Sequence, residues 1–303
     1  MLTEHRGMPA TTLAPAPTAF RDERQGQALM LAGGLLLGTL GVFLQEAGQD
    51  PLMAVWFRCA FGGLALLAWG LISARLGELR LARRGLLAAV AAGLLMLLNW
   101  GLFFAAIERT SIAVATVVFH VQPLLVMAFG VLFLREPFSR RQGAAVLLAL
   151  LGLALATGLM DQLQALDRAY VWGLLMCLGG SLSYAAVTLI AKSVRGVSSF
   201  ALAWWQCAVG SLVLLAWPLS QGWPGWGAAW GWLAGLGLIH TGLAYVLLYA
   251  GINRLPAGRI AVLQFVYPAT AVLVDWAVYG RALSPLQLLG VAMMAAAIAS
   301  LKR

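Results

Sequence analysis

The sequence predicts an all-α polytopic membrane protein with ten transmembrane helices, organised as two inverted five-helix repeats. The first observation is composition: 62% of the 303 residues are hydrophobic and 10% are charged, too little polar surface for a soluble protein of this length. The second is that roughly ten apolar runs approach the ~20 residues that a spanning helix needs. The third is an internal repeat that relates the two halves of the chain.

The predicted spans follow one another with short connections, which leave no room for a catalytic domain outside the membrane. They lie at residues 28–45, 52–74, 86–107, 112–134, 143–160, 171–191, 199–219, 227–250, 258–279 and 285–301. A Pro- and Ala-rich segment, 1–27, precedes them and is predicted to be a disordered cytoplasmic tail. The first repeat is expected at 28–160 and the second at 171–303, with a periplasmic linker at 161–170.

The internal repeat is clearest where residues 56–71 align with residues 204–219, because ten of sixteen positions are identical. Pro123 and Pro268 are related by a similar offset of about 145 residues. An odd number of spans in each copy places the two copies in opposite orientations across the membrane. Inverted repeats of this kind are typical of secondary transporters.

Basic residues fall almost entirely on one side of the predicted membrane. Sixteen Lys and Arg residues lie in the termini and alternate loops on that side, against Arg109, Arg168 and Arg281 on the other. The positive-inside rule therefore places both termini in the cytoplasm, and the inner membrane of a bacterial cell is the expected location. The net charge of +9 is explained by this orientation signal, so no nucleic-acid partner is expected.

Motifs for enzymatic chemistry and for cofactors are absent from the sequence. The three cysteines fall inside predicted spans, and the three histidines form neither an H-E-x-x-H motif nor a Cys/His metal site. Without a P-loop or a Ser–His–Asp spacing, we expect no catalytic residue, metal, cofactor or enzyme activity. The expected partners are a small-molecule substrate and membrane lipids, with no obligatory protein partner.

Pro123 and Pro268 occupy corresponding positions near the midpoints of their spans. Proline removes a backbone hydrogen bond and kinks a helix, which frees carbonyl groups near Phe119 and Gln264. In the middle of a bilayer, a free carbonyl is tolerated only against protein or water. A static kink that shapes packing is the simpler alternative, but duplication of the feature favours a hinge at each proline beside a binding site.

Polar and aromatic side chains gather around the two prolines and at similar depth in neighbouring spans. A lining that is aromatic, polar and nearly free of fixed charge suits a small solute with a ring or an apolar side chain. A phosphate would instead call for Arg or Lys clusters. The alternative for each side chain is contact with a neighbouring helix. The residues predicted to bind substrate are Asn99, Trp100, Phe119, His120, Gln122, Tyr184, His240, Tyr245, Tyr249, Gln264 and Tyr267, with Thr116, Thr241 and Phe265 nearby.

Arg58 and Asp275 are the two residues of fixed charge that lie clearly within predicted spans. Both are expected near the periplasmic ends of their spans, so we predict a gate whose two charges separate and rejoin. The alternatives are a structural ion pair, snorkelling toward headgroups, or a site for the carboxylate of a zwitterion. The shallow position of Asp275 and the lack of a second carboxylate argue against proton coupling there.

The stretch from Phe129 to Leu155, in which a span ends in Leu-Arg-Glu-Pro and Gln142 and Gly143 follow, resembles the EamA-type repeat of the drug/metabolite transporter superfamily. Within that superfamily the chain is most similar to YddG-type exporters of aromatic and other amino acids. The resemblance implies a basket of five plus five helices around a central cavity. The second repeat departs from the pattern: at the position that corresponds to Glu136 of the first repeat it carries Arg281 instead of an acidic residue. Glu136 is expected to cap a helix or to form a salt bridge between loops.

The function predicted from these features is export of aromatic or hydrophobic amino acids and related metabolites by alternating access. A multidrug or other small-metabolite carrier on the same scaffold is the main alternative. A membrane-embedded enzyme that acts on lipid substrates is a remote one, because the sequence offers no cluster of His, Asp or Glu at one membrane face.

Overall fold

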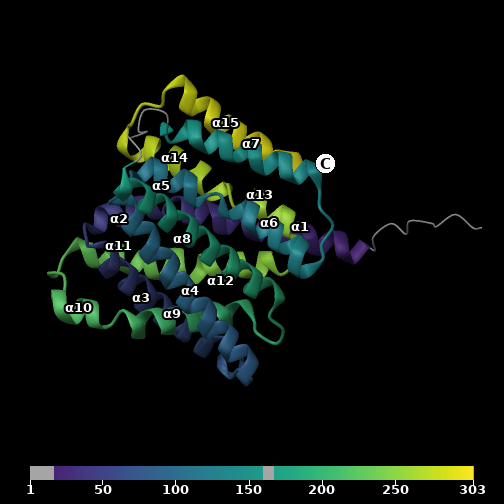
Figure 1. The fold of residues 1–303 in the computed structure, drawn as a ribbon. Helices are drawn as coiled ribbons and strands as arrows, with labels where there is room; N and C mark the ends of the chain where they lie inside the picture. Colours follow the sequence, from purple (N-terminus) through teal and green to yellow (C-terminus); the bar gives the residue numbers. More distant parts are fainter. Residues whose placement is uncertain (1–16, 160–166, 303) are drawn as a thin grey trace, which may run out of the picture.

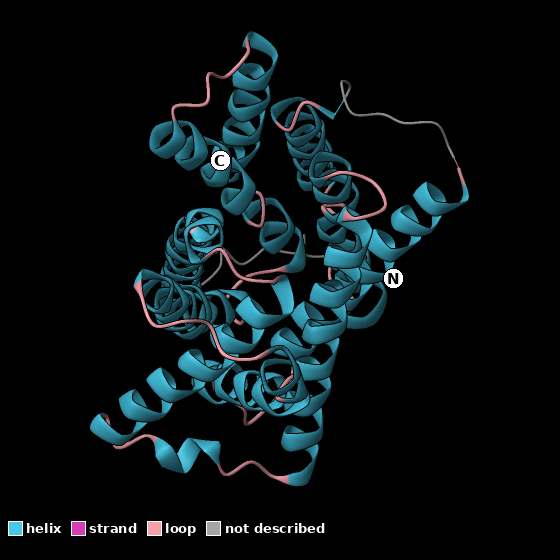
Figure 2. Ribbon diagram, turned by 90° about the vertical axis from the view of Figure 1, so that its left-hand side faces the viewer, coloured by secondary structure: helices cyan, strands magenta, loops and turns pink. Residues whose placement is uncertain are grey.

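The computed structural model describes residues 17–159 and 167–302, and in these ranges the chain consists of helices and short connections (Figure 1, Figure 2). The spans of the first half are α1 (Pro17–Gly38) continued by α2 (Leu40–Ala47), α3 (Pro51–Ile72), α4 (Arg83–Ile107), α5 (Ile112–Phe119) continued by α6 (Gln122–Leu134), and α7 (Arg140–Ala156). A short 3₁₀ helix, η1 (Leu76–Leu79), lies between α3 and α4.

The second half repeats this organisation. Its spans are α8 (Arg168–Ser193), α9 (Ser199–Val213) continued by α10 (Ala216–Gln221), α11 (Ala228–Gly237) joined to α12 (Ala244–Ile252) by a π-helix at Leu238–Leu243, α13 (Ala257–Leu263) continued by α14 (Val266–Tyr279), and α15 (Pro285–Ala299) with the 3₁₀ turn Ser300–Lys302. Among the described residues, eight helical units are long and apolar enough to cross a membrane, and α15 is a shorter apolar helix. The predicted all-α polytopic fold is confirmed.

The first helix begins earlier than predicted. Residues 17–27 were expected to belong to a disordered tail, but α1 starts at Pro17, so that part of the prediction is wrong. Glu23 accepts a hydrogen bond from Arg259 at 2.6 Å, and Gly26 packs against Leu255. These tertiary contacts stabilise a polar segment that its composition alone does not. Residues 1–16 of the predicted tail, residue 160 at the end of the predicted first repeat, and residues 161–166 of the predicted linker lie outside the described residues.

Helix packing between the halves is symmetric. The third span of each half packs against the first span of the other half, as α4 with α8 and α12 with α1. The fourth spans do the same, as α6 with α8 and α14 with α1. Two further pairs join equivalent helices: α3 with α9 at one edge of the bundle and α7 with α15 at the opposite edge (Figure 1). Exchange of the two halves therefore maps the packing onto itself, as inverted repeats require.

The outer surface of the bundle is apolar. Leu132, Phe133 and Leu212 expose large hydrophobic side chains to more than half of their full extent. A soluble monomer rarely presents so much contiguous apolar surface, whereas a bilayer accepts it without cost. The helices therefore leave these side chains facing lipid.

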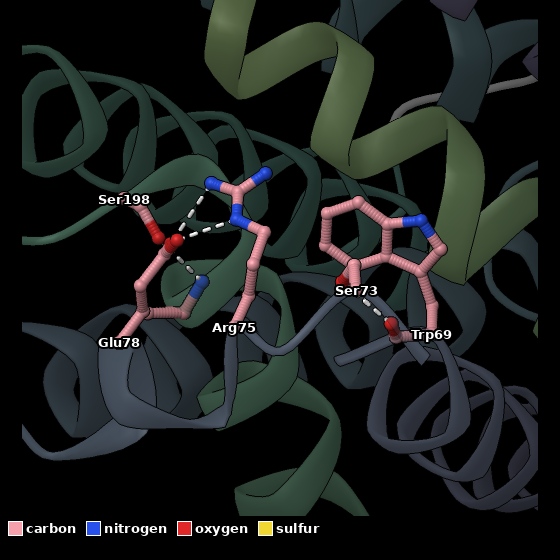
Figure 3. A network of polar contacts seen from close by, with 6 residues as sticks. Trp69, Ser73, Arg75, Glu78 and Ser198 are labelled. Atoms are coloured by element: carbon pink, nitrogen blue, oxygen red, sulfur yellow. Dashed lines mark hydrogen bonds and ion pairs between the residues drawn. The ribbon is translucent and has the colours of Figure 1, made fainter. Parts of the chain in front are cut away.

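A polar network holds the connection between α3 and α4 against α9 (Figure 3). Arg75 donates from Nη2 to Oε2 of Glu78 at 3.0 Å, and its guanidinium lies 5.0 Å from the centre of the Trp69 ring. The hydrogen bond from Arg75 is the largest cause that holds the pKa of the Glu78 carboxyl below its ordinary value, and Ser198 contributes a second hydrogen bond. Trp205 adds a bond from Nε1 to the Leu79 carbonyl at 3.1 Å. The loop is thus tied to the start of α9.

Two equivalent helix ends use the left-handed backbone conformation. Arg135 ends α6 with φ of 55°, and Gly280 ends α14 with φ of 65° at the corresponding position of the second half. A left-handed conformation costs a residue with a side chain about 1–2 kcal/mol, and glycine avoids this cost. The first half therefore carries local strain that the second half does not.

We expect Arg135→Gly to be neutral or to raise the free energy of unfolding by up to about 1 kcal/mol, because glycine accepts positive φ. Arg135→Val should lower it by about 1–2 kcal/mol, because a β-branched residue tolerates that conformation poorly. Thermal or chemical unfolding of the purified protein in detergent measures both. Arg84, an exposed residue in the first turn of α4, is the matched control. At Arg84 the glycine variant should be less stable than the valine variant, the reverse of the order at Arg135. The same order at both positions would contradict the explanation by backbone conformation.

Candidate substrate-binding site

A cavity of about 240 Å³ lies between the two halves, at the level where α5 meets α6 and α13 meets α14. Ten of the eleven residues predicted to bind substrate line it: Asn99, Trp100, Phe119, His120, Gln122, Tyr184, Tyr245, Tyr249, Gln264 and Tyr267. The remaining one, His240, does not. The symmetry of the packing explains why residues so far apart in the sequence meet, because α1, α4 and α6 of one half surround the same space as α8, α12 and α14 of the other.

Both helix breaks lie just before the prolines, as predicted. α5 ends at Phe119, and α6 begins at Gln122 with Pro123 in its first turn. α13 ends at Leu263, and Pro268 lies in the first turn of α14. A proline in the first turn of a helix costs no hydrogen bond, so the chain starts a new half-helix there.

The carbonyl group freed beside Pro123 has a partner. The Ser181 hydroxyl of α8 lies 2.7 Å from the Phe119 carbonyl oxygen and donates to it. Gln122 donates from Nε2 to Oε1 of Gln264 at 2.7 Å, which joins the breaks of the two halves directly. The two breaks therefore form one connected unit at the centre of the bundle. Their role as hinges stays a prediction.

His120 presents one ring nitrogen to this central region. Its Nδ1 lies 2.7 Å from the Thr116 carbonyl oxygen, which can only accept, so Nδ1 carries the proton. The ring packs parallel to that of Tyr267, with 6.1 Å between ring centres. Within the described residues, Nε2 has no hydrogen-bond partner, and His120 lines the cavity. A neutral His120 can therefore accept a hydrogen bond from a bound solute.

The structure does not bring the predicted gate residues together. Asp275 pairs with Arg281 at 3.0 Å, on the exposed side of α14. Arg58 is 4% exposed, lines the cavity, and donates from Nε to Oγ1 of Thr241 at 3.1 Å. Its guanidinium lies 4.7 Å from the centre of the Trp100 ring. Similar depth did not imply contact, because α3 packs against α9 and α11 rather than against α14. The two charges have separate environments.

His240 belongs to the packing behind the cavity. It lies in the π-helix, is fully buried, and its Nε2 is 2.8 Å from Oγ1 of Thr39. Thr39 separates α1 from α2, so this bond joins two irregular helix segments. Phe43 packs edge-on to the imidazole at 4.6 Å. The prediction that His240 lines the pocket is therefore not supported by its position.

Several residues that line the cavity were not predicted from the sequence. Gly34, Gly41 and Leu44 of the first span and Phe103 and Phe104 of the third complete the wall. They are apolar, and apolar residues in a membrane span carry no local signal that separates lipid contact from cavity contact. The run of glycines in the first span was the available hint, because small residues allow close approach.

Glu136 caps a helix as expected, whereas its ion pair is with the last turn of a helix and not with a loop. Its Oε2 accepts from the backbone N–H of Ala257 at 2.6 Å at the start of α13, and its Oε1 lies 2.9 Å from Nζ of Lys192 at the end of α8. Lys192 also donates to the Leu255 carbonyl. These contacts join the ends of α6 and α8 to the start of α13. We call the region where these three helix ends meet the Glu136 end of the bundle.

Part of the cavity wall lies far from the Glu136 end. α4 runs antiparallel to α8, because Gly173 near the start of α8 packs against Thr110 just after α4. Phe103 and Phe104, near the end of α4, therefore lie on the side remote from Lys192. At the Glu136 end, Gly130 of α6 packs so tightly against Ala257 of α13 that an added Cβ would lie 2.3 Å from it. This end is closed by close packing and by the ion pair.

No group of three or more metal-binding side chains occurs in the part of the chain that the structure describes. The geometry is that of a chamber lined by aromatic and polar side chains. A model of the EamA-like transporter family matches residues 24–158 and again residues 171–302, which correspond to the two halves.

Full-length relatives support the same comparison. The chain is 27% identical over 280 residues to the uncharacterized transporter YxxF of Bacillus subtilis, covering 89% of this chain and 87% of that protein. It is 29% identical over 280 residues to an uncharacterized transporter of Archaeoglobus fulgidus, covering 92% and 97%. It is 30% identical over 272 residues to the uncharacterized transporter YwfM of Bacillus subtilis, covering 88% and 89%. A crystal structure with 19% identity superposes with a TM-score of 0.81 over 91% of this chain and 95% of that one, which shows the shared fold.

Proposed function

Because the family model covers both halves of the sequence, this chain belongs to the EamA-like transporter family of the drug/metabolite transporter superfamily, and we propose that it exports aromatic and hydrophobic amino acids and related small metabolites. It is a multi-pass membrane transporter and not an enzyme. The observation that carries the proposal is the cavity between the halves, whose wall combines Trp100, Phe119, Tyr184 and Tyr267 with a few polar groups. Such a wall matches a small solute with an aromatic or apolar side chain.

Cavity size favours a metabolite over a drug. Pockets for drug-sized ligands usually occupy about 300–1,000 Å³. At about 240 Å³, this cavity is smaller than that range and suits a solute of amino-acid size. A buried cation, Arg58, also disfavours the cationic compounds that multidrug carriers often move. A multidrug function is therefore the weaker alternative.

The proposed transport cycle is alternating access around the two helix breaks. In the described conformation an ion pair and close packing hold the Glu136 end together, and the cavity wall includes residues near the opposite end. Rearrangement at Pro123 and Pro268 would open the Glu136 end and close the opposite one. We propose that the protein lies in a bacterial inner membrane with both termini and the Glu136 end in the cytoplasm, as the distribution of basic residues favours.

Flux of phenylalanine into proteoliposomes, with and without a pH gradient, tests the proposed function. We expect saturable flux for the native chain and a reduction of about tenfold in Trp100→Ala and His120→Ala, because each removes a wall contact. Trp226→Ala, which removes an 88% exposed ring, is the matched control and should keep native flux. Absence of phenylalanine flux in every condition would overturn the proposal. Native flux in both wall variants would show that the cargo binds elsewhere.

A further inference from the structure

Among the described residues, Arg58 is the single fixed charge in the cavity wall. Among the described residues that line the cavity there is no Asp, Glu or Lys. Arg58 is 4% exposed, and none of the ion pairs between described residues includes it. Its contacts include the Thr241 hydroxyl, the Trp100 ring and the Tyr245 hydroxyl, all of which are uncharged. The wall of an otherwise neutral cavity therefore carries one uncompensated positive charge.

A buried cation without an anion is expensive. Removing an ion from water costs several kcal/mol even after the protein relaxes, and neutral hydrogen bonds or an aromatic face recover only part of that cost. The position does not require a charge for helix packing, because the corresponding residue of the second half is Gln206. Arginine is also the side chain whose rigid donor fork matches a carboxylate. An anion in the cavity would supply the missing partner.

We propose that Arg58 binds the carboxylate of the cargo, and that the cargo is an aromatic or apolar monocarboxylate whose amino group is dispensable. The proposal rests on the transport function above and narrows its substrate class. A monoanion neutralises the wall, whereas a zwitterion leaves the complex with one positive charge and an amine leaves it with two. No described lining residue offers a carboxylate to an ammonium group.

The aromatic residues beside Arg58 complete the match. Trp100 lies under the guanidinium, and Tyr245 and Tyr249 stack nearly parallel with 5.7 Å between ring centres. The packed tryptophan fixes the orientation of the guanidinium before the cargo arrives, so that little side-chain entropy is lost on binding. A solute whose carboxylate meets Arg58 would place an attached ring among these aromatic faces.

Three compounds that share a phenyl ring and a two-carbon chain separate the contributions of the two charged groups. They are 3-phenylpropionate with the carboxylate alone, phenylalanine with both groups, and phenethylamine with the ammonium alone. Calorimetric titration of the native chain in nanodiscs at neutral pH avoids leakage of weak acids through lipid. We expect 3-phenylpropionate to bind at least as tightly as phenylalanine, and phenethylamine to bind about tenfold more weakly or worse.

Substitutions at Arg58 test whether the guanidinium causes this order of affinities. Arg58→Gln installs the side chain that the second half carries and should weaken binding of 3-phenylpropionate by about tenfold or more, while the uncharged 3-phenylpropanamide changes by less than about twofold. Arg58→Lys keeps the positive charge but lacks the forked guanidinium, so its affinity for 3-phenylpropionate should lie between those of the native chain and Arg58→Gln. Arg254→Gln makes the same charge change at an exposed residue and should match the native chain. If Arg58→Gln does not fold, Arg58→Lys and the order on the native chain still decide.

The outcomes separate this inference from the proposed function. Phenylalanine flux without binding of 3-phenylpropionate would overturn the inference and leave the proposed function in place. Binding and flux of 3-phenylpropionate without phenylalanine would support the inference and overturn amino-acid export. Equal binding of phenethylamine and 3-phenylpropionate, or an unchanged order in a folded Arg58→Gln variant, would show that Arg58 does not bind the cargo.

Discussion

A phenylalanine placed at Gly41 should block transport while leaving the protein folded. Gly41 lies on the helix face that lines the cavity, between Leu37 and Leu44. A Cβ at this position has no heavy atom within 4 Å, so a longer side chain has open space to enter. A phenyl ring there would fill a large part of the cavity of about 240 Å³. Cargo and ring cannot occupy the same space, because protein interiors are close-packed.

A graded series makes this test quantitative. Flux of a transported solute should fall progressively through Gly41→Ala, Gly41→Leu and Gly41→Phe, with a loss of at least about tenfold at the last step, which corresponds to about 1.4 kcal/mol. Gly101→Phe is the matched control, because a Cβ at Gly101 also meets nothing within 4 Å and Gly101 does not line the cavity. Native flux in a folded Gly41→Phe variant would contradict passage of the cargo through this cavity. Gly34 is unsuitable, because a Cβ there would lie 2.9 Å from Val266.

Loss of the Glu136 carboxylate should open the end of the bundle that it closes. Its side chain is 20% exposed, and that of Lys192 is 15% exposed, so water screens their ion pair only in part. Glu136→Gln keeps an oxygen that can accept from Ala257 but removes the charge, and Glu136→Ala removes both contacts. A charged hydrogen bond contributes about 1.5–3 kcal/mol, which is enough to shift a two-state equilibrium by about tenfold or more.

A cysteine at Thr188 reports this opening. Thr188 lies in α8, is 2% exposed, and borders a small void between α6, α8 and α13 at the Glu136 end. We expect labelling of Thr188→Cys by a polar maleimide to rise by about tenfold in Glu136→Gln and more in Glu136→Ala. Glu78→Gln breaks an ion pair within one loop and is the control that should not change labelling. If buried Cys207 becomes labelled in parallel, the variant has unfolded rather than opened, and the role of Glu136 is structural.

Most of the side chains that the sequence singled out lie together around one cavity. Proline acts through its own covalent structure, so Pro123 and Pro268 located the breaks without knowledge of the fold. Polar side chains such as Gln122 and Gln264 are excluded from lipid, which left the interior as their place. Inverted symmetry then required the two sets to meet. Hydrophobic composition and span length, which act on each segment separately, were sufficient for the fold class.

The sequence predicted less about side chains whose position depends on which neighbouring helix they contact. Arg58 and Asp275 have similar depth, but depth along a helix does not specify which neighbour a side chain faces. The rotation of α3 directs Arg58 toward Trp100 and Thr241, whereas Asp275 faces Arg281. His240 was placed in the cavity because histidine is polar, yet Thr39 and the π-helix satisfy it elsewhere. No pattern of the sequence indicated that irregular helix.

By itself, the sequence determined a duplicated membrane transporter with two central helix breaks, because lipid imposes hydropathy, span length and backbone hydrogen bonding on each segment regardless of its neighbours. Tertiary structure alone decided that Arg58 stands uncompensated in the cavity wall, that Glu136 joins three helix ends, and that Gly41 borders open space in the cavity. Each of these depends on which faces of the helices meet. Packing between helices sets that choice over distances of a few ångströms, and residues far apart in the chain contribute equally to it.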